Sequence, residues 1–187
     1  MPECLARLSC ILLDLQPILT FRLGKLFLFE GGVRVPFMMK WPGRIRPGTV
    51  NSRPVSALDL FPTICAAAEA RLPAGLSLDG VDLLPWLDDA RPGMPHEFLF
   101  WRNGPNHAVR KGNWKLIQAK THVWLFDLKT DPGERENLAD KRPEVVRELQ
   151  QAFEAWQQEM QEPAWPSKFE IEQGRELIDG IEYEIHV

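Results

Sequence analysis

The residues with the clearest potential for chemistry lie in one short stretch, GKLFLFEGGVRVPFMMKWPG, at residues 24–43. This stretch places Lys25, Glu30 and Arg34 inside an otherwise apolar run, with a pair of glycines directly after the glutamate. Lysine and arginine are costly to bury without partners. Paired glycines cost backbone entropy unless the chain needs a positive φ or a close approach there. The stretch therefore either holds an anion or makes a demanding structural turn.

The cysteines and histidines give no indication of a metal site or a disulfide framework. Cys4, Cys10 and Cys65 are scattered and form no C-x-x-C pair, and the four histidines show no metal-ligand spacing. The sequence also offers no cluster of carboxylates that suits calcium. We therefore expect free thiols and no cofactor bound by this chain itself.

The composition sets limits on the class of protein. The chain has 187 residues, of which 44% are hydrophobic, so it can bury a substantial core. A net charge of −4 argues against nucleic acid as the main partner. No apolar run approaches the roughly 18 residues of a membrane span. Asp14 interrupts the early apolar run and no small-residue cleavage site follows it, so no signal peptide is indicated. The localisation stays open.

The elements expected between residues 24 and 96 belong to an α/β arrangement. A turn at the glycines leads into a predicted strand at Val33–Lys40. Ser56 and Asp59 have the spacing of a helix start, and they precede a predicted helix at Leu58–Ala68. The following segment is rich in proline and glycine, and we expect one short helical turn there, at Leu83 to Leu87.

The pattern changes from residue 97. Short apolar runs separated by turn residues predict a β-meander, an antiparallel sheet of about four strands. Apolar residues at helical spacing predict a helix from Pro143 to Met160, and alternation from Ile181 onward predicts a terminal strand. The expected division is an unassigned segment at 1–23, a second region at 24–96 and a third at 97–187.

Six phrases in a fixed order carry a resemblance to a known family. They are GK(x)4EGGVRVP, WPG, LDLFPT, LDGVDLLP, AVRKGNWKLI and LFDLKTDPGERENLA. Together they resemble the C-terminal portion of a type I sulfatase of the arylsulfatase kind, in the alkaline-phosphatase-like superfamily. The resemblance covers residues 24 to about 160. It implies an α/β edge fragment of the sulfatase core followed by a small α+β domain, a four-stranded antiparallel sheet with a helix.

The resemblance implies an activity for which this chain lacks some of the required residues. Sulfatases hydrolyse sulfate esters, of small molecules or sugars, with a formylglycine made in a C-x-P-x-R or S-x-P-x-R motif and with a divalent cation, usually calcium. The sequence from Cys4 to Arg7 lacks the proline and the spacing, and Asp14 lacks a following asparagine. We interpret the chain as a fragment that is inactive alone.

The resemblance also assigns roles to single residues. It implies that Lys25 contacts the sulfate, whereas the residues alone favour a solvated lysine. Arg34 is expected to pair with Glu30, and Asp59 to cap a helix. His107, in the turn WRNGPNH, either reaches the substrate pocket or is a satisfied loop residue.

Two other functions stay open. The first is a non-catalytic binding or structural α+β module, and the second is a phosphonate or phosphodiester hydrolase of the same superfamily. If the edge elements lack their neighbouring strands, their exposed apolar faces favour self-association.

Overall fold

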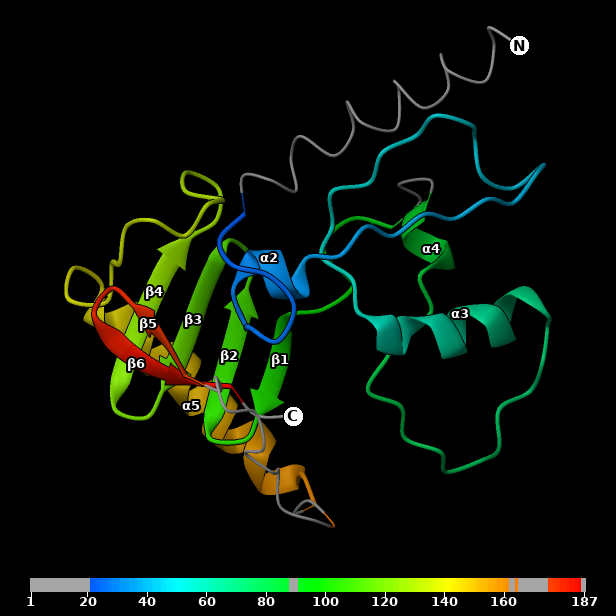
Figure 1. Ribbon diagram of the computed structural model, residues 1–187. Coiled ribbons are helices and arrows are strands. Elements are labelled where there is room, and N and C mark those ends of the chain that lie inside the picture. The colour runs from blue at the N-terminus through cyan, green and yellow to red at the C-terminus, as the bar shows by residue number, and fades with distance from the viewer. Residues whose placement is uncertain (1–20, 88–90, 162–163, 165–174, 186–187) are drawn as a thin grey trace, which may run out of the picture. The chain divides into compact units, whose positions relative to one another are not determined.

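The computed structural model describes residues 21–87, 91–161, 164 and 175–185 (Figure 1). Its elements are α2 (Glu30–Val33), the 3-10 helix η2 (Ala57–Asp59), α3 (Leu60–Ala67), α4 (Leu84–Leu87), β1 (Phe98–Asn103), β2 (Asn106–Lys111), β3 (Trp114–Ala119), β4 (His122–Asp127), α5 (Pro143–Glu159), β5 (Arg175–Ile178) and β6 (Ile181–Glu184). They form two compact units. One joins the segment that ends at Val35 to the segment that begins at Phe100, and the other runs from Pro36 to Leu99.

The first unit is built on an antiparallel sheet with the strand order β1-β2-β3-β4. Ile117 on β3 lies opposite Ala108 on β2 and Trp124 on β4. The turn from β2 to β3 contains Gly112 at φ +57°, a conformation that tight hairpin turns require and glycine adopts without cost. The predicted four-stranded meander is therefore confirmed.

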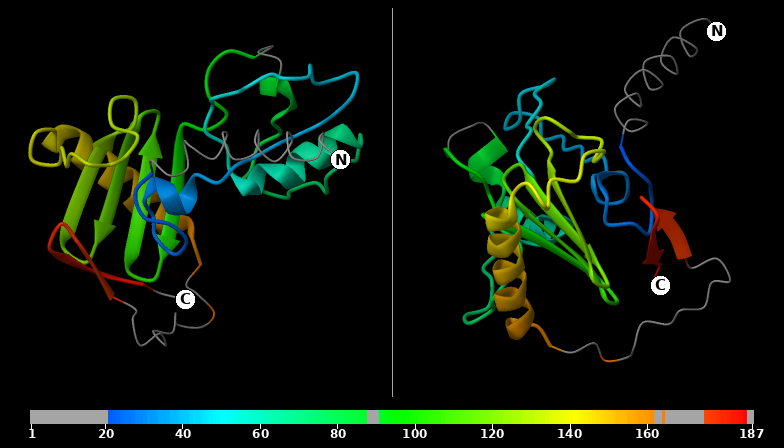
Figure 2. Two further views of the ribbon diagram at one scale, coloured as in Figure 1. Left: turned by 45° about the horizontal axis from the view of Figure 1, so that its top comes forward. Right: turned by 90° about the vertical axis from the view of Figure 1, so that its left-hand side faces the viewer.

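The two faces of this sheet are covered by different parts of the chain (Figure 2). One face carries α5, which confirms the predicted helix and buries Leu149 and Phe153. The other face carries the chain around Phe29 and the hairpin β5–β6, which contributes Tyr183 to the main hydrophobic core. Both faces are thus in use within this one unit.

Two details of this unit differ from expectation. The predicted strand at Val33–Lys40 is wrong: residues 30–33 form the short helix α2, and no strand follows it before Phe98 in the described chain. The N–H of Arg34 donates to the carbonyl of Glu30 and so ends a helical turn, and Pro36 has no N–H to offer a sheet. Strand β6 was expected, but its partner β5 was not, because three of the four residues of β5 are exposed and show no alternation.

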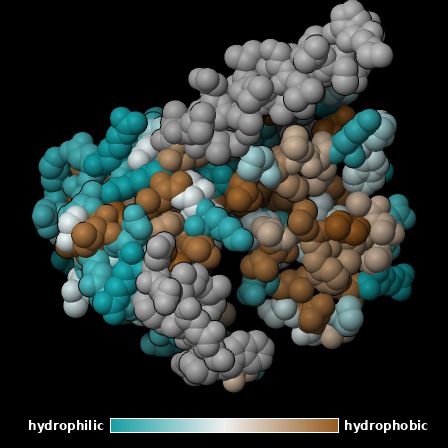
Figure 3. Space-filling view, viewed as in Figure 1, coloured by the Kyte–Doolittle hydropathy of each residue, from teal (hydrophilic) through white to brown (hydrophobic). Residues whose placement is uncertain are grey.

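The second unit contains α3 and α4, and both were predicted. Ser56 and Asp59 form a capping box: the Asp59 carboxylate accepts the Ser56 N–H at 2.7 Å. The hydroxyl of Thr63 on α3 accepts the N–H of Leu83 at 2.9 Å, which holds the chain before α4. Apolar side chains also gather on the surface of this unit (Figure 3).

The expected division at residue 96 does not coincide with these units. The segment from Gly24 to Val35 groups with the sheet that begins near residue 100, and not with residues 36–96. Within the described ranges, no helix is long and apolar enough to cross a membrane. The unassigned segment 1–23 lies almost entirely outside the described residues.

Candidate functional site

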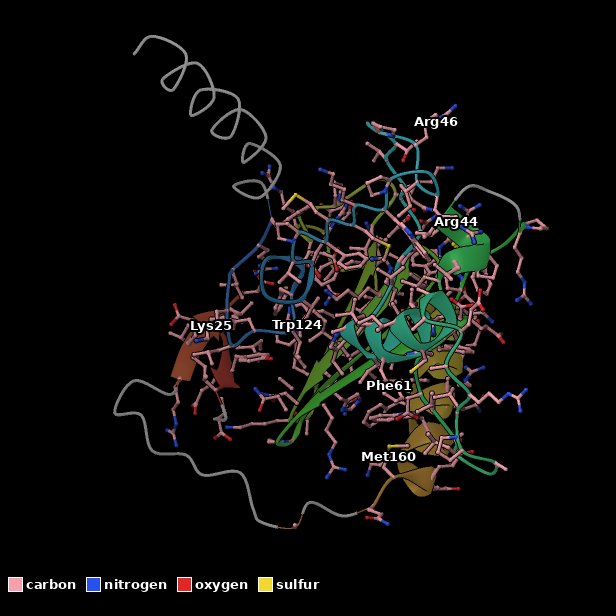
Figure 4. All side chains as sticks on the ribbon, turned by 90° about the vertical axis from the view of Figure 1, so that its right-hand side faces the viewer. Lys25, Arg44, Arg46, Phe61, Trp124 and Met160 are labelled. Carbon is pink, nitrogen blue, oxygen red and sulfur yellow. The ribbon has the colours of Figure 1, made fainter. Side chains whose placement is uncertain are left out.

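The candidate site centres on the Lys25 loop, residues 22–27. The loop turns on itself, and the N–H of Phe27 donates to the carbonyl of Gly24 at 3.1 Å. Lys25 is exposed and makes no hydrogen bond or ion pair with the described residues. It lies on the opposite side of the sheet from Met160, which follows α5 (Figure 4). Its ammonium is therefore available to an anion.

The two glycines of α2 bring the Lys25 loop close to the helix backbone. The N–H of Gly31 donates to the carbonyl of Arg22 at 3.0 Å. A Cβ atom on Gly31 would lie 2.2 Å from the carbonyl oxygen of Leu23, and one on Gly32 would lie 2.0 Å from that of Phe27. Real Cβ atoms do not approach backbone oxygens so closely. The glycine pair therefore serves a close approach of the loop and not a positive φ.

Glu30 anchors α2 to the sheet through a buried ion cluster. The Nζ atom of Lys115, on β3, lies 2.9 Å from Oε1 of Glu30 and 2.9 Å from Oε1 of Glu134. The N–H of Glu30 donates to Oε2 of Glu134 at 2.6 Å. The side chains of Lys115 and Glu134 are fully buried, and that of Glu30 is 1% exposed. Water is excluded, so each charge depends on its partners.

Two arginines complete this cluster at its more exposed edge. Nη1 of Arg34 and Nη1 of Arg110 each lie 3.7 Å from Oε2 of Glu30, so the expected pairing of Arg34 with Glu30 is confirmed. Burial raises the pKa of the Glu134 carboxyl, and the nearby Lys115 opposes that shift. Burial also lowers the pKa of the Arg110 guanidinium.

Lys115 and Glu134 are members of this cluster that were not predicted from the sequence. A signal was present for the lysine, because WKLI places it inside an apolar strand. Glu134 lies in a polar turn, TDPGERENLA, where nothing in the sequence marks it as buried.

His107 belongs to a different place. Its ring stacks on Phe153 of α5 at 3.7 Å between centroids, and burial lowers its pKa to about 4. Its neighbour Ala108 belongs to the core on the other face of β2, together with Phe29. His107 therefore lies on the helix-covered face, and the structure does not bring it together with Lys25.

Asp59, expected as a helix cap, has that role and a second one in its own unit. Its carboxylate is buried, with both oxygens near Nε2 of His96, at 2.8 and 2.9 Å. One of the oxygens also accepts the N–H of Val81 at 2.9 Å. The described residues contain no group of three His, Cys, Asp or Glu side chains that could hold a metal ion.

Comparison with known proteins identifies the family. Residues 22–161 match the family model described as "N-sulphoglucosamine sulphohydrolase, C-terminal". The chain belongs to the sulfatase family. The matched residues include the Lys25 loop, α2, the four-stranded sheet and α5, so the resemblance seen in the sequence is confirmed.

Individual sulfatases align with most of the chain. It is 36% identical over 168 residues to mouse steryl-sulfatase, with 72% of this chain covered. It is 39% identical over 159 residues to bovine arylsulfatase A, with 70% covered. It is 30% identical over 156 residues to N-acetylgalactosamine-6-O-sulfatase of Bacteroides thetaiotaomicron, with 74% covered. The chain spans 27% to 31% of the length of these sulfatases.

Solved structures agree with this assignment. Ps i-CgsB, in complex with k-i-k-neocarrahexaose, matches with a TM-score of 0.65 and 28% identity, over 74% of this chain and 32% of that one. A Bacteroides thetaiotaomicron protein from a study of glycosaminoglycan metabolism matches with a TM-score of 0.63 and 29% identity, over the same shares. The sheet with its helix is thus the C-terminal α+β part of a sulfatase of the alkaline-phosphatase-like fold.

Proposed function

We propose that this chain supplies a sulfate-contacting lysine, Lys25, to the active site of a sulfatase. One observation carries the proposal: Lys25 is exposed and without a partner among the described residues, on a loop whose backbone is held in place. The spacing GK(x)4EGG, which carries the sulfatase resemblance, supports the same role.

The chemistry suits an ammonium group. Hydrolysis of a sulfate ester builds negative charge on the bridging and terminal oxygens. A cation held in place beside these oxygens stabilises that charge more than it stabilises the ground state. Such a group contributes about 10²- to 10³-fold in rate. The substrate class that we propose is a sulfated small molecule or a sulfated sugar. We expect neither nucleic acid nor a membrane to be a partner.

Calcium, which the sulfatase family implies, does not fit the described residues. The buried carboxylates of Glu30 and Glu134 are engaged by Lys115, and that of Asp59 by His96 and backbone N–H groups. The sequence has no C-x-P-x-R or S-x-P-x-R motif for the nucleophile. Lys25 alone falls far short of the roughly 10⁶-fold acceleration of an enzyme, so the isolated chain does not hydrolyse sulfate esters, with or without calcium.

A chimeric enzyme tests the role of Lys25. Residues 22–187 replace the corresponding C-terminal part of bovine arylsulfatase A, and turnover of an aryl sulfate is measured. We expect Lys25→Ala to lower kcat by about 10²- to 10³-fold. The matched control is Lys129→Ala, which also removes an exposed lysine from the same unit.

Two results would contradict the proposal. One is a folded chimera in which Lys25→Ala turns over substrate as fast as the parent. The other is a folded chimera that turns over no aryl sulfate at all, because this chain would then lack what the active site needs. Turnover by the purified 187-residue chain would contradict the expected inactivity.

A further inference from the structure

The hairpin β5–β6 lies beyond residue 161, where the match to the sulfatase family model ends. It packs on the same face of the sheet as the Lys25 loop, since Tyr183 and Phe29 share one core. Its side chains contact both ends of that loop. These contacts suggest a role for a segment that the family comparison does not cover.

The first contact is made at the start of the loop. Nη2 of Arg22 donates to Oδ1 of Asp179, in the turn of the hairpin, at 2.6 Å. Nη1 of the same guanidinium donates to the carbonyl of Glu134 at 2.8 Å, and the guanidinium lies over the ring of Phe29 at 5.0 Å. The hydrogen bond from Arg22 lowers the pKa of Asp179, so the carboxylate is ionised at neutral pH.

The second contact is made at the end of the loop. The rings of Phe27 and Tyr183, on β6, lie 5.4 Å apart between centroids. Tyr183 is fully buried, and its ring also lies 6.3 Å from that of Phe29. The hairpin is itself tied to the sheet, because Nδ2 of Asn106 donates to the carbonyl of Glu184 at 2.5 Å.

The loop between these contacts needs external support. Leu23 and Leu26 have positive φ angles of 59° and 84°, which non-glycine residues adopt at a cost of the order of 1–3 kcal/mol each. Such a conformation persists where the surroundings determine it. Lys25 lies between these two leucines and makes no hydrogen bond or ion pair with the residues that the structure describes.

We propose that hairpin β5–β6 is a clamp that positions Lys25. Asp179 holds the first residue of the Lys25 loop and Tyr183 holds the last, so the hairpin fixes where the ammonium points. The inference rests on the proposed role of Lys25. Asp179 and Tyr183 are positioning residues and do not themselves contact the substrate.

Amide hydrogen exchange on the 187-residue chain tests the clamp. Asp179→Gly removes the carboxylate, which accepts from Arg22 and also, at 3.0 Å, from Nε1 of Trp124 on β4, while glycine accepts the positive φ of 53° at this position. The amide of Phe27 donates to a carbonyl within the loop, and the amide of Gly31 donates to the carbonyl of Arg22 at its start. We expect both amides to exchange about fivefold faster, which is the factor that corresponds to the loss of a partly exposed ion pair. The amides of β3 should keep their rates.

A variant on the same hairpin provides the control. Leu177 is 74% exposed on β5, so Leu177→Ala should leave the loop amides unchanged. Unchanged loop exchange in Asp179→Gly would overturn the clamp. An equal increase across the loop and β3 would also overturn it, because that result means general loosening.

The chimera separates this proposal from the one on which it rests. There, Asp179→Gly should lower kcat several-fold while the protection of β3 stays intact. If Lys25→Ala leaves turnover unchanged, the sulfate contact fails, even where exchange supports the clamp. If Lys25→Ala lowers kcat and Asp179→Gly changes neither kcat nor loop exchange, only the clamp fails.

Discussion

Replacing Lys115 with methionine removes the cation between two buried carboxylates and keeps most of the side-chain volume. In the parent chain, Nζ lies 2.9 Å from both Glu30 and Glu134. Removing one partner of a buried ion pair costs about 3–5 kcal/mol, because the remaining charge stays buried. Arg110, which is 17% exposed and 3.7 Å from Glu30, compensates in part. We therefore expect a loss near the lower end of that range.

Urea unfolding followed by tryptophan fluorescence measures this loss. Burial already raises the pKa of Glu134, and removing Lys115 raises it further, because the nearby cation is what opposes the shift. A carboxyl group whose pKa is higher in the folded state stabilises that state at any pH below its unfolded-state pKa of about 4.3. This stabilisation is lost as the pH rises through the folded-state pKa. The deficit of Lys115→Met should therefore be largest at neutral pH and should shrink as the pH falls toward 5.

Two further variants define how the result is read. Lys129→Met changes an exposed lysine and should alter the free energy of unfolding by less than about 0.5 kcal/mol. The triple variant Glu30→Gln, Lys115→Met, Glu134→Gln removes all three charges and should recover part of the loss. If Lys115→Met lowers the free energy of unfolding by less than about 1 kcal/mol, the cluster does not hold α2 as argued. The same conclusion follows if the loss does not change with pH.

Two further predictions concern the glycine pair and the exposed apolar surface. Gly32→Ala should destabilise the protein and release the Lys25 loop, because its Cβ would meet the Phe27 carbonyl at 2.0 Å. A Cβ at Gly24 has nothing within 4 Å, so Gly24→Ala should be tolerated. Thermal unfolding and amide exchange of the loop compare the two variants, and equal effects would refute the close approach. We also propose that the chain self-associates through α3, where Phe61 and Ile64 are 53% and 63% exposed. Sedimentation at rising concentration should show oligomers that Phe61→Ser with Ile64→Ser reduces, and a monodisperse parent would contradict this.

Features set by neighbouring residues could be predicted from the sequence. The meander follows from short apolar runs with turn residues between them, and α5 follows from its helical spacing. The capping box of Ser56 and Asp59 spans only three residues, so its pattern is visible in the sequence itself.

Features set by distant packing could not be predicted in this way. The glycine pair indicates an unusual backbone, but the carbonyls that it approaches follow from the path of the loop. The run after the glycines has the composition of a strand but forms none, and Glu30, which precedes it, contacts Lys115, 85 residues away. Strand β5 forms because β6 pairs with it, and its own exposed residues give no periodic signal.

The ion cluster also has a consequence for the order in which the protein is built. Glu30 meets Glu134 across 104 residues and Lys115 across 85, so the Lys25 loop is synthesised long before its supports. On the ribosome, Glu30 has only the more exposed arginine Arg34 nearby, and its buried partners are missing until β3 and the turn at residue 134 have emerged. Contacts of such long sequence separation form late, because closing the intervening chain costs entropy before the contact repays it. The lysine proposed to bind sulfate therefore reaches its working position only after most of this chain has been synthesised.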